Sequence, residues 1–375
     1  MIINKLKSRV KPLHFLLIFA LLFSGNLFAD KSSEHNEEKG DDFNAGEMIL
    51  HHVKDAHTIH IGPLHVPLPI ILVDDGLKMF SSSAFYHNEK HLEIGHGEDV
   101  QKVHYYEHDG YILFHEKIYK AKDGGLVLDE HGHPKNEKVS MDLSITKNVA
   151  GLLLGLLVLF LVMLSVAKAY KRGAGKAPKG IQNVIEIFVL FIRDEVAKPS
   201  IGKGYEKFVP FLLNIFFFIW TLNLLGLIPF LGGLNVTGNI AVTMVLASFV
   251  LILQVYNANG GFWKHMVAPP GVPLWLLPLM IPIELFGFVI KPVVLTLRLF
   301  ANITAGHIII LSFTSLIFIF SAKFGAGAGY GTSIVAVAFS VFMNVLELLV
   351  AFLQAYVFTL LAAIYFGMAT EEAHH

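Results

Sequence analysis

Arg298 is a charged residue in the middle of an apolar run, Val289–Leu316, that is long enough to cross a lipid bilayer. An arginine inside a membrane costs between about 2.5 and about 17 kcal/mol, depending on how far its side chain can reach toward the interface. The guanidinium group cannot escape this cost by losing its proton. We therefore expect Arg298 to need an anionic partner, as intramembrane charges at ion or substrate sites do.

The same apolar segment carries further polar residues at regular spacing. Glu284, Lys291 and Arg298 are seven residues apart, which puts them on one face of a helix. Asn302 lies one turn beyond Arg298, and His307 follows further along the chain. Titratable groups are an expensive means of joining helices inside a membrane. This face is therefore a candidate ion path.

The last apolar segment carries a matching pair, Glu347 and Gln354, which are also seven residues apart. If the two segments form an antiparallel hairpin, residues equally distant from its turn lie at equal depth. A turn in the glycine-rich linker Phe324–Gly331 places Arg298 level with Gln354, and His307 level with Glu347. Histidine titrates near neutral pH and burial can bring a glutamate into that range, so the second pair suits proton relay. For Asn302 and Gln354 taken alone, hydrogen bonding between helices is an equally good interpretation.

The composition indicates a membrane protein. Of the 375 residues, 54% are hydrophobic and only 16% are charged, and the mean hydropathy is +0.58. The apolar residues come in blocks of membrane-spanning length. The absence of cysteine excludes disulfide bonds and thiolate chemistry.

We predict an all-α membrane protein with about five transmembrane helices. The expected spans are Asn148–Ala167, Phe208–Phe230, Val236–Tyr256, Leu274–Ala322 and Ser333–Met368. A helix of 40 residues is about 60 Å long, roughly twice the hydrocarbon thickness. The last two segments must therefore be broken or strongly tilted, and Pro282 and Pro292 are expected to bend the first of them.

Charge predicts the orientation. Five basic residues follow the first span without an intervening acid, namely Lys168, Lys171, Arg172, Lys176 and Lys179. The positive-inside rule places this loop in the cytoplasm. Apolar residues at helical spacing then predict an amphipathic helix on the cytoplasmic membrane surface: Ile181, Val184, Ile185, Phe188 and Ile192. The uncharged loop Leu231–Asn235 is expected outside, and Asn257–Gly271 inside.

The chain before residue 141 has a different character. Residues 1–29 resemble a secretory signal, with basic residues, an apolar stretch and small residues near Ala29. The alternative is a membrane anchor that is not cleaved. Residues 31–140 hold 11 lysines, 20 acidic residues and 14 of the 19 histidines. We expect residues 30–140 to form an acidic, histidine-rich extracytoplasmic extension with scattered strand-like runs such as Tyr111–Phe114. Residues 141–375 are then the membrane domain.

One group in this extension could bind a metal ion. Its members are His51, His52, Asp55 and His57, and histidines at helical spacing can share a face. The alternative is a solvated or amphipathic element, because the histidines are spread over the whole extension.

The stretch Leu295-Thr-Leu-Arg-Leu-Phe-Ala-Asn-Ile-Thr-Ala-Gly306 closely resembles subunit a of the F-type ATP synthases, the stator half of a rotary membrane motor. Three further stretches support the resemblance: Asn223-Leu-Leu-Gly-Leu-Ile-Pro229, Glu284 to Pro292, and Leu353-Gln-Ala-Tyr-Val-Phe358. It covers about residues 141–372.

The resemblance implies that Arg298 is the stator arginine that faces the rotor ring. It also implies that Asn302, His307, Glu347 and Gln354 line the outer half-channel, with Glu284 near the inner one. Lys291 shares the face of Glu284 and joins the candidate proton-translocation residues. In the best-studied bacterial members the first acidic position is Glu and the later one is His. Here they are exchanged, as His307 and Glu347, which supports a spatial pair.

The resemblance also implies partners and a location. The partners are the rotor c-ring, the peripheral-stalk subunit b and membrane lipid, without nucleic acid, bound nucleotide or a cofactor. The location is a bacterial inner membrane, with the N-terminal region periplasmic and Glu371-Glu372 cytoplasmic. Whether H⁺ or Na⁺ is carried stays open.

Two other classes of membrane protein fit the sequence less well. A secondary transporter with an intramembrane arginine site should show internal repeats or paired broken helices, and the sequence shows neither. A membrane enzyme is disfavoured because Gly173-Ala-Gly-Lys176 lacks the full phosphate-loop spacing, and no HExxH or GxSxG motif is present.

Overall fold

The computed structural model describes residues 46, 49, 54–61, 64–74, 76–94, 101–121, 125–129, 132–173, 177–228, 231, 233–267 and 273–370. The expected signal at 1–29, two of the four candidate metal ligands (His51 and His52), Lys176 and the Glu371-Glu372 end lie outside these residues. The chain divides into two compact units. One, here called the β unit, contains residues 54–150, and the other, here called the membrane unit, contains residues 151–227 and 235–375.

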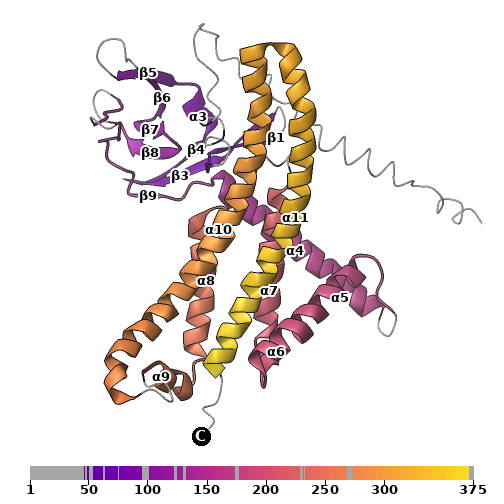
Figure 1. Ribbon diagram of the computed structural model, residues 1–375. Helices are drawn as coiled ribbons and strands as arrows, with labels where there is room; N and C mark the ends of the chain where they lie inside the picture. Colours follow the sequence, from indigo (N-terminus) through magenta and orange to yellow (C-terminus); the bar gives the residue numbers. More distant parts are fainter. Residues whose placement is uncertain are drawn as a thin grey trace, which may run out of the picture. The chain divides into compact units, whose positions relative to one another are not determined.

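The β unit is built from short antiparallel strands (Figure 1). Its elements are β1 (Thr58–Ile61), β2 (Leu64–Pro67), β3 (Pro69–Val73), β4 (Leu77–Ser81), α3 (Ser83–Tyr86), β5 (Glu89–Ile94), β6 (Gln101–His108), β7 (Tyr111–Phe114), β8 (Lys117–Lys120) and β9 (Met141–Asp142). They form sheets in the orders β1-β2, β4-β3-β9 and β5-β6-β7-β8. The all-α class therefore applies to the membrane unit only, and the strand-like runs of the extension are real strands.

Strand β7 shows why this region folds. Its four residues, Tyr111–Phe114, form a continuous apolar run and are all buried. Tyr111 and Leu113 pack on one cluster with Ile70, Leu72 and Phe85. The alternate side chains of β7 pack on a second cluster with Tyr105, Tyr119 and Leu126. A strand buried on both faces must be apolar throughout, because successive side chains point to opposite sides.

Two-residue turns fix the register on either side of β7. Asp109-Gly110 joins β6 to β7 with φ of 46° and 78°, and His115-Glu116 joins β7 to β8 with φ of 47° and 61°. Two successive positive φ angles are the signature of the type I′ turn, whose twist matches that of the flanking strands. The tight turns leave little freedom for a slipped register.

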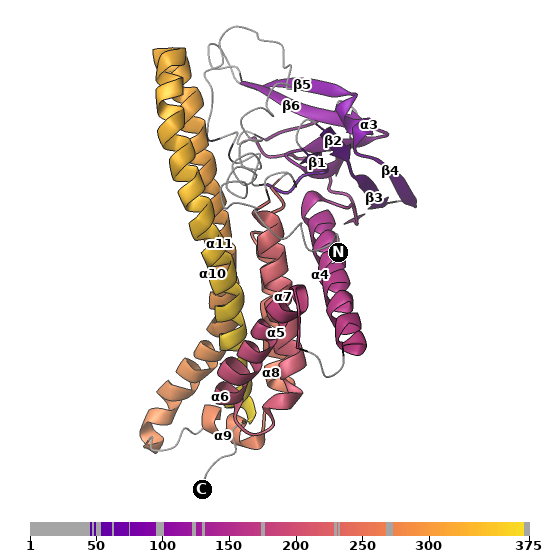
Figure 2. The same cartoon turned by 90° about the vertical axis from the view of Figure 1, so that its right-hand side faces the viewer.

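The membrane unit is helical (Figures 1 and 2). Its elements are α4 (Lys147–Arg172, whose first residues belong to the β unit), α5 (Ile181–Phe191), the π-helix η3 (Ile192–Ala197), α6 (Lys198–Ile201), the 3₁₀ turn η4 (Tyr205–Lys207), α7 (Val209–Gly226), α8 (Ile240–Tyr256), α9 (Gly260–Val267), the 3₁₀ turn η6 (Leu274–Leu276), α10 (Leu277–Phe324) and α11 (Ala326–Thr370).

Within the described ranges, four helices are long and apolar enough to cross a membrane, namely α4, α7, α10 and α11. A fifth span is added if α8 and α9, which meet at 103°, count as one broken span. This number agrees with the expected five.

The long hairpin α10–α11 turns more sharply than expected. The predicted linker Phe324–Gly331 is helical except at Gly325, whose φ is 85°. Only glycine reaches this backbone region readily, so one residue suffices to end α10. Just past the turn, Gly329 lies against Ser321, and a Cβ at Gly329 would lie 2.8 Å from the Cβ of Ser321. Small residues thus let the two helices approach closely.

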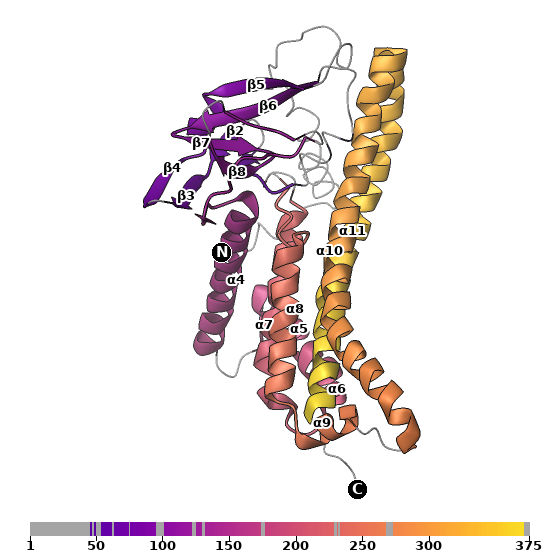
Figure 3. The same ribbon diagram turned by 90° about the vertical axis from the view of Figure 1, so that its left-hand side faces the viewer.

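Helix α10 stays continuous through Pro282 and Pro292. Figures 1 and 3 show that its N-terminal third, which contains both prolines, bends away from α11. Proline removes one backbone donor and crowds the preceding turn, which accounts for the expected bend.

The core of the membrane unit lies between α7 and the C-terminal half of α11 (Figure 2). Phe188 of the predicted amphipathic helix, here α5, contacts the rings of Trp220 and Phe352. Ile185 and Ile192 are buried in the same core, whereas Ile181 and Val184 are exposed. The helix is therefore present, but much of the apolar face expected to meet lipid packs on protein; its place at the membrane surface stays a prediction.

Candidate functional site

His307 on α10 and Glu347 on α11 form the central contact of the hairpin. His307 Nδ1 lies 2.7 Å from Glu347 Oε1, a hydrogen bond. The side chains are 13% and 4% exposed. Since the two residues are 40 apart in sequence, only the hairpin register brings them together. The predicted depth match of His307 and Glu347 is thereby confirmed.

A glycine makes room for this pair. A Cβ added at Gly306 would lie 2.6 Å from Glu347 Oε1 and 2.9 Å from its Cδ, closer than real Cβ contacts. The other carboxylate oxygen of Glu347, Oε2, is buried and has no hydrogen-bond partner among the described residues. A buried carboxylate held by one imidazole is an arrangement that can accept and return a proton.

Arg298 lies on a different face of α10 and is exposed. Its exposed neighbours are apolar, among them Val294 at 41% and Leu297 at 48%. No hydrogen bond or ion pair joins Arg298 to any residue within the described ranges. Asn302, one turn further along, is exposed as well. Arg298, without a hydrogen-bond or ion-pair partner among the described residues, therefore lies in an exposed apolar surface of the chain.

The register of the hairpin gives the depth of Gln354 relative to Arg298. Contacts along the hairpin join Phe313 to Phe339 and Lys291 to Tyr365, on either side of the His307–Glu347 bond. These pairs put Arg298 within about one helical turn of half-buried Gln354 in depth. No hydrogen bond links the two side chains in the described structure, so their contact stays a prediction.

Lys291 and Glu284 lie toward the start of α10. Lys291 Nζ is 5.4 Å from the centre of the Tyr365 ring and 3.9 Å from Met368 Sδ, both near the end of α11. Glu284 is half-buried. Along α10, 14 residues separate Glu284 from Arg298, which is about 21 Å, and nine separate Arg298 from His307, about 13 Å. The predicted polar residues thus form two groups on opposite sides of Arg298.

The sequence interpretation missed polar residues on α7 and the segment that follows it. Asn223 is 2% exposed. Its Nδ2 donates to the carbonyl oxygen of Ala351, one turn from Glu347, and its Oδ1 accepts from Thr237 Oγ1 at 2.7 Å. An asparagine within an 18-residue apolar helix was the available signal, but the sequence could not say which helix it faces.

A second missed residue is Gln254 on α8. It is 1% exposed, and its Nε2 has no partner among the described residues. It lines a small pocket with Pro292, Leu295 and Tyr365. This pocket lies on the Lys291 side of Arg298, because Pro292 follows Lys291 in sequence and the Tyr365 ring contacts Lys291.

Of the candidate metal group at 51–57 the structure describes only Asp55 and His57, so this site stays a prediction. Asp55 Oδ1 accepts from the backbone N of Asn148 at 3.0 Å, at the first turn of α4, where a carboxylate is favourable. His57 is buried, and its Nδ1 lies 3.3 Å from Glu116 Oε2. Both residues therefore have structural partners, and His51 and His52 lie outside the described residues.

Comparison with known proteins adds independent findings. Residues 149–367 match the family described as ATP synthase A chain, and residues 48–143 match a domain of unknown function (DUF8433). An "ATP synthase subunit a" of Chloroherpeton thalassium is 44% identical over 248 residues, which cover 64% of this chain and 71% of the relative. An "ATP synthase subunit a 2" of Chlorobaculum tepidum is 42% identical over 289 residues, 76% of this chain and 78% of the relative.

A third relative gives the same result. An "ATP synthase subunit a" of Myxococcus xanthus is 40% identical over 261 residues, covering 66% of this chain and 80% of the relative. The family match covers more than half of the chain and includes all the candidate proton-path residues on the hairpin. The chain, a multi-pass helical membrane protein, belongs to the ATP synthase subunit a family.

Proposed function

We propose that this chain is the proton-translocating stator subunit of an F-type ATP synthase. Two offset half-channels load and unload protons on carboxylates of a rotor ring, so that proton flow drives ATP synthesis. One observation carries the proposal: Arg298 is exposed on an apolar face of α10 and has no anion among the described residues.

An exposed arginine in an apolar surface calls for an anion from another subunit. The cost of the charge inside the membrane falls when a carboxylate of a partner lies beside it. A carboxylate near a permanent cation also favours its ionised form. Arg298 would therefore attract each rotor carboxylate that has lost its proton and hold it in that state.

The outer half-channel contains the buried pair His307–Glu347 and Asn302. The 2.7 Å hydrogen bond and the partnerless Oε2 of Glu347 support proton exchange at this point. Asn223 and Thr237 extend the polar path toward α7. Gln354 lies at about the depth of Arg298, where the path would deliver its proton.

The inner half-channel contains Glu284 and Lys291, and Gln254 lines the pocket with Tyr365, whose ring lies under Lys291. About 35 Å of helix separates Glu284 from His307, and Arg298 lies between them. A proton cannot pass Arg298 directly, because a permanent positive charge repels it. The proton is instead carried by a rotor carboxylate, which is a neutral carboxylic acid while protonated and tolerates contact with lipid.

The energy of the process limits its stoichiometry. A charge that crosses 100 mV releases about 2.3 kcal/mol, so several protons are needed for each ATP. The chain itself catalyses no reaction in this proposal. It acts with a rotor c-ring and with a peripheral stalk of subunit b, in a bacterial inner membrane.

The central test replaces Arg298 by Lys and by Ala. Lysine is a compact charge that can lose its proton when buried and lacks the planar fork of arginine. Both variants should reach the membrane in normal amounts and lose proton-driven ATP synthesis. Arg193→Lys is the matched control, because Arg193 is exposed and, in the part of the chain that the structure describes, forms hydrogen bonds with the adjacent Asp194 alone. Near-normal synthesis in either Arg298 variant would contradict the proposal.

The orientation has its own test. We propose that residues 30–140 lie outside and that the C-terminus lies inside. Single cysteine probes suit this chain, which has none of its own. Lys117 is a better probe position than Lys120, because Lys117 is exposed whereas Lys120 forms a salt bridge with Asp74. A membrane-impermeant reagent should label Lys117→Cys from outside; labelling only after the cytoplasmic face is opened would reverse the orientation.

A further inference from the structure

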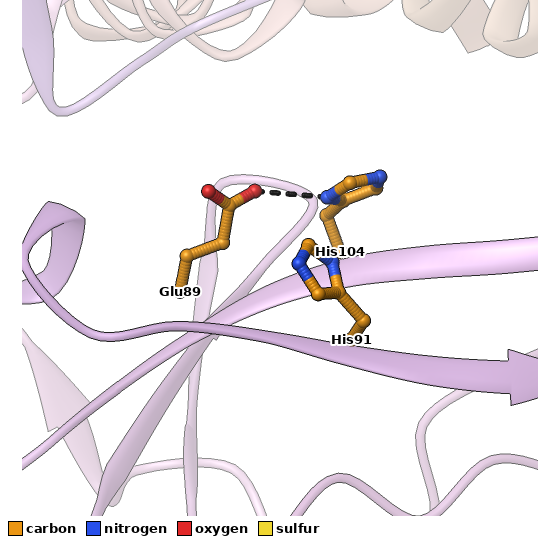
Figure 4. Close-up of side chains that lie close together, drawn as sticks. All are labelled: Glu89, His91 and His104. Atoms are coloured by element: carbon orange, nitrogen blue, oxygen red, sulfur yellow. Dashed lines mark hydrogen bonds and ion pairs between the residues drawn. The ribbon is translucent and has the colours of Figure 1, made fainter. Parts of the chain in front are cut away.

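A second set of ligand-bearing side chains lies in the β unit, outside the proton path. Glu89 and His91 on β5 and His104 on β6 point to one face of the four-stranded sheet (Figure 4). His91 pairs directly with His104 across the two strands. Residues 89 and 91 share a face because side chains alternate along a strand. The sheet register therefore brings these three residues together, although they are 15 positions apart at most.

The distances are those of a site that can close on a metal ion. One ligand atom from each residue lies within 4.8 Å of the other two. A metal held at 2.0–2.2 Å by each ligand needs ligand atoms about 3.3 Å apart. Closing the cluster requires shifts of about 1.5 Å, which exposed side chains achieve by small rotations. His104 and Glu89 have side chains that are 49% and 32% exposed.

Among the described residues, no lysine or arginine pairs with the Glu89 carboxylate. Lys90 lies between Glu89 and His91 in sequence, so it points to the other face of the strand. There its Nζ forms a 2.6 Å salt bridge with Glu107. Glu89 instead accepts a 2.8 Å hydrogen bond from His104 Nδ1. The carboxylate of Glu89 is therefore next to an imidazole and available as a metal ligand.

We propose that Glu89, His91 and His104 bind a divalent transition-metal ion, with Zn²⁺ as the best match. Two imidazoles and one carboxylate are ligands that Zn²⁺ takes readily, whereas Ca²⁺ and Mg²⁺ prefer oxygen ligands. The exposed position leaves at least one coordination site to solvent. β5 is the edge strand of its sheet, so the ion would also fasten the edge to β6.

The test uses the full chain, purified with a tag that contains no histidine and stripped of metal with a chelator. Calorimetric titration with ZnCl₂ should show one strong site above the weak binding expected from 19 histidines. His91→Ala and His104→Ala should each weaken this site at least about tenfold, since even indirect partners of a metal contribute that much. Glu89→Gln should weaken it less, and a large excess of CaCl₂ should not compete.

His87→Ala is the matched control, because His87 is exposed in the same unit and lies outside the cluster. It should leave the strong site unchanged. If alanine lowers the thermal midpoint of the metal-free protein, His91→Gln and His104→Gln replace it, since glutamine keeps a polar side chain of similar size. Cu²⁺ provides a second readout: its EPR spectrum should show two imidazole nitrogens in the wild type and one in each histidine variant.

The proposal is overturned if both cluster variants keep the strong Zn²⁺ site. It is equally overturned if His87→Ala weakens the site as much as they do, because binding is then spread over the histidine-rich extension. These outcomes are independent of proton transport, which is not measured in this test.

Discussion

The chain contains two His–Glu contacts of nearly equal length in different surroundings. His307 and Glu347 meet at 2.7 Å between two membrane helices, with 13% and 4% of their side chains exposed. His104 and Glu89 meet at 2.8 Å on a sheet surface, with 49% and 32% exposed. The two pairs thus have the same functional groups and nearly the same separation, but we propose proton relay for the first and metal binding for the second.

Burial is what separates them. Charge on the buried pair is poorly screened, so moving one proton between imidazole and carboxylate changes the local energy strongly. The exposed pair is screened by water and contributes little to stability. It can exchange its hydrogen bond for a metal ion at small cost, especially with His91 beside it. Geometry alone therefore does not assign a role to a His–Glu pair.

The largest expected difference comes from removing the same carboxylate charge in each pair. Glu347→Gln should lower proton-driven ATP synthesis by roughly 10²-fold or more, because it removes a proton-exchange group. Glu89→Gln, its matched control, should leave synthesis unchanged. Inverted membrane vesicles can be assayed for both variants. Equal activity of the two would show that burial does not distinguish the pairs.

The second prediction exchanges the partners of the buried pair. His307→Glu with Glu347→His keeps one acid and one imidazole at the same depth. The double variant should therefore recover more activity than the two single variants predict together, since non-additivity is expected for residues in contact. The same exchange between Glu89 and His104 should not alter ATP synthesis. A buried-pair double variant at or below the additive expectation would mean that the two residues do not act as a relay.

The third prediction concerns the space around Glu347. Gly306→Ala places a methyl group 2.6 Å from Glu347 Oε1, so the carboxylate or α10 must shift. Overpacking of this kind costs about 1–3 kcal/mol, and proton-driven synthesis should fall several-fold without being abolished. Gly287→Ala on the same helix is the control, because a Cβ there meets nothing within 4 Å. Thermal unfolding in detergent and the synthesis rate should change together only in Gly306→Ala.

The smallest effect is expected in the β unit at acid pH. The hydrogen bond from Lys120, with a second from Ser140, lowers the pKa of the Asp74 carboxyl from its ordinary value of 3.8. A lowered folded-state pKa gives stability that is present above the unfolded value and is lost as the pH falls through the folded value. The midpoint of thermal unfolding of the β unit should therefore fall below about pH 4.

Asp74→Asn should lower this midpoint at neutral pH and flatten its acid dependence. Asp109→Asn is the control, because the Lys78–Asp109 pair is exposed and should contribute little. Circular dichroism of the β-sheet signal can follow both variants. An unchanged acid profile in Asp74→Asn would assign the acid sensitivity to other carboxylates.

Much of the membrane unit was predictable, because helix geometry is nearly the same everywhere. Apolar blocks gave the spans, and a seven-residue spacing gave the polar face of α10. Equal distance from the turn gave the His307–Glu347 contact. The predicted turn spans the eight residues Phe324–Gly331, whereas in the structure Gly325 alone interrupts the helices. The alanines and glycines after Gly325 are helical because small residues let α11 pack closely on α10.

The β unit was much less predictable. Its strands are only two to eight residues long, and their pairing depends on turns with positive φ at His115 and Glu116 that the residue types do not signal. The same limit explains which metal ligands the sequence suggested. The suggested ligands are close together in sequence, namely His51, His52, Asp55 and His57. His91 and His104 meet only through strand pairing, which the sequence does not reveal.

Composition and a fixed rise per residue were enough to predict the helical class of the membrane unit, its approximate spans and the equal depth of His307 and Glu347. Apart from the His307–Glu347 contact, which follows from equal distance to the turn, the sequence did not reveal which side chains face each other across helices or strands. Only the tertiary structure placed Arg298 on an exposed face, Asn223 beside α11, and Glu89 next to His104. Such neighbours depend on helix rotation and strand register, and both are decided by packing between distant parts of the chain.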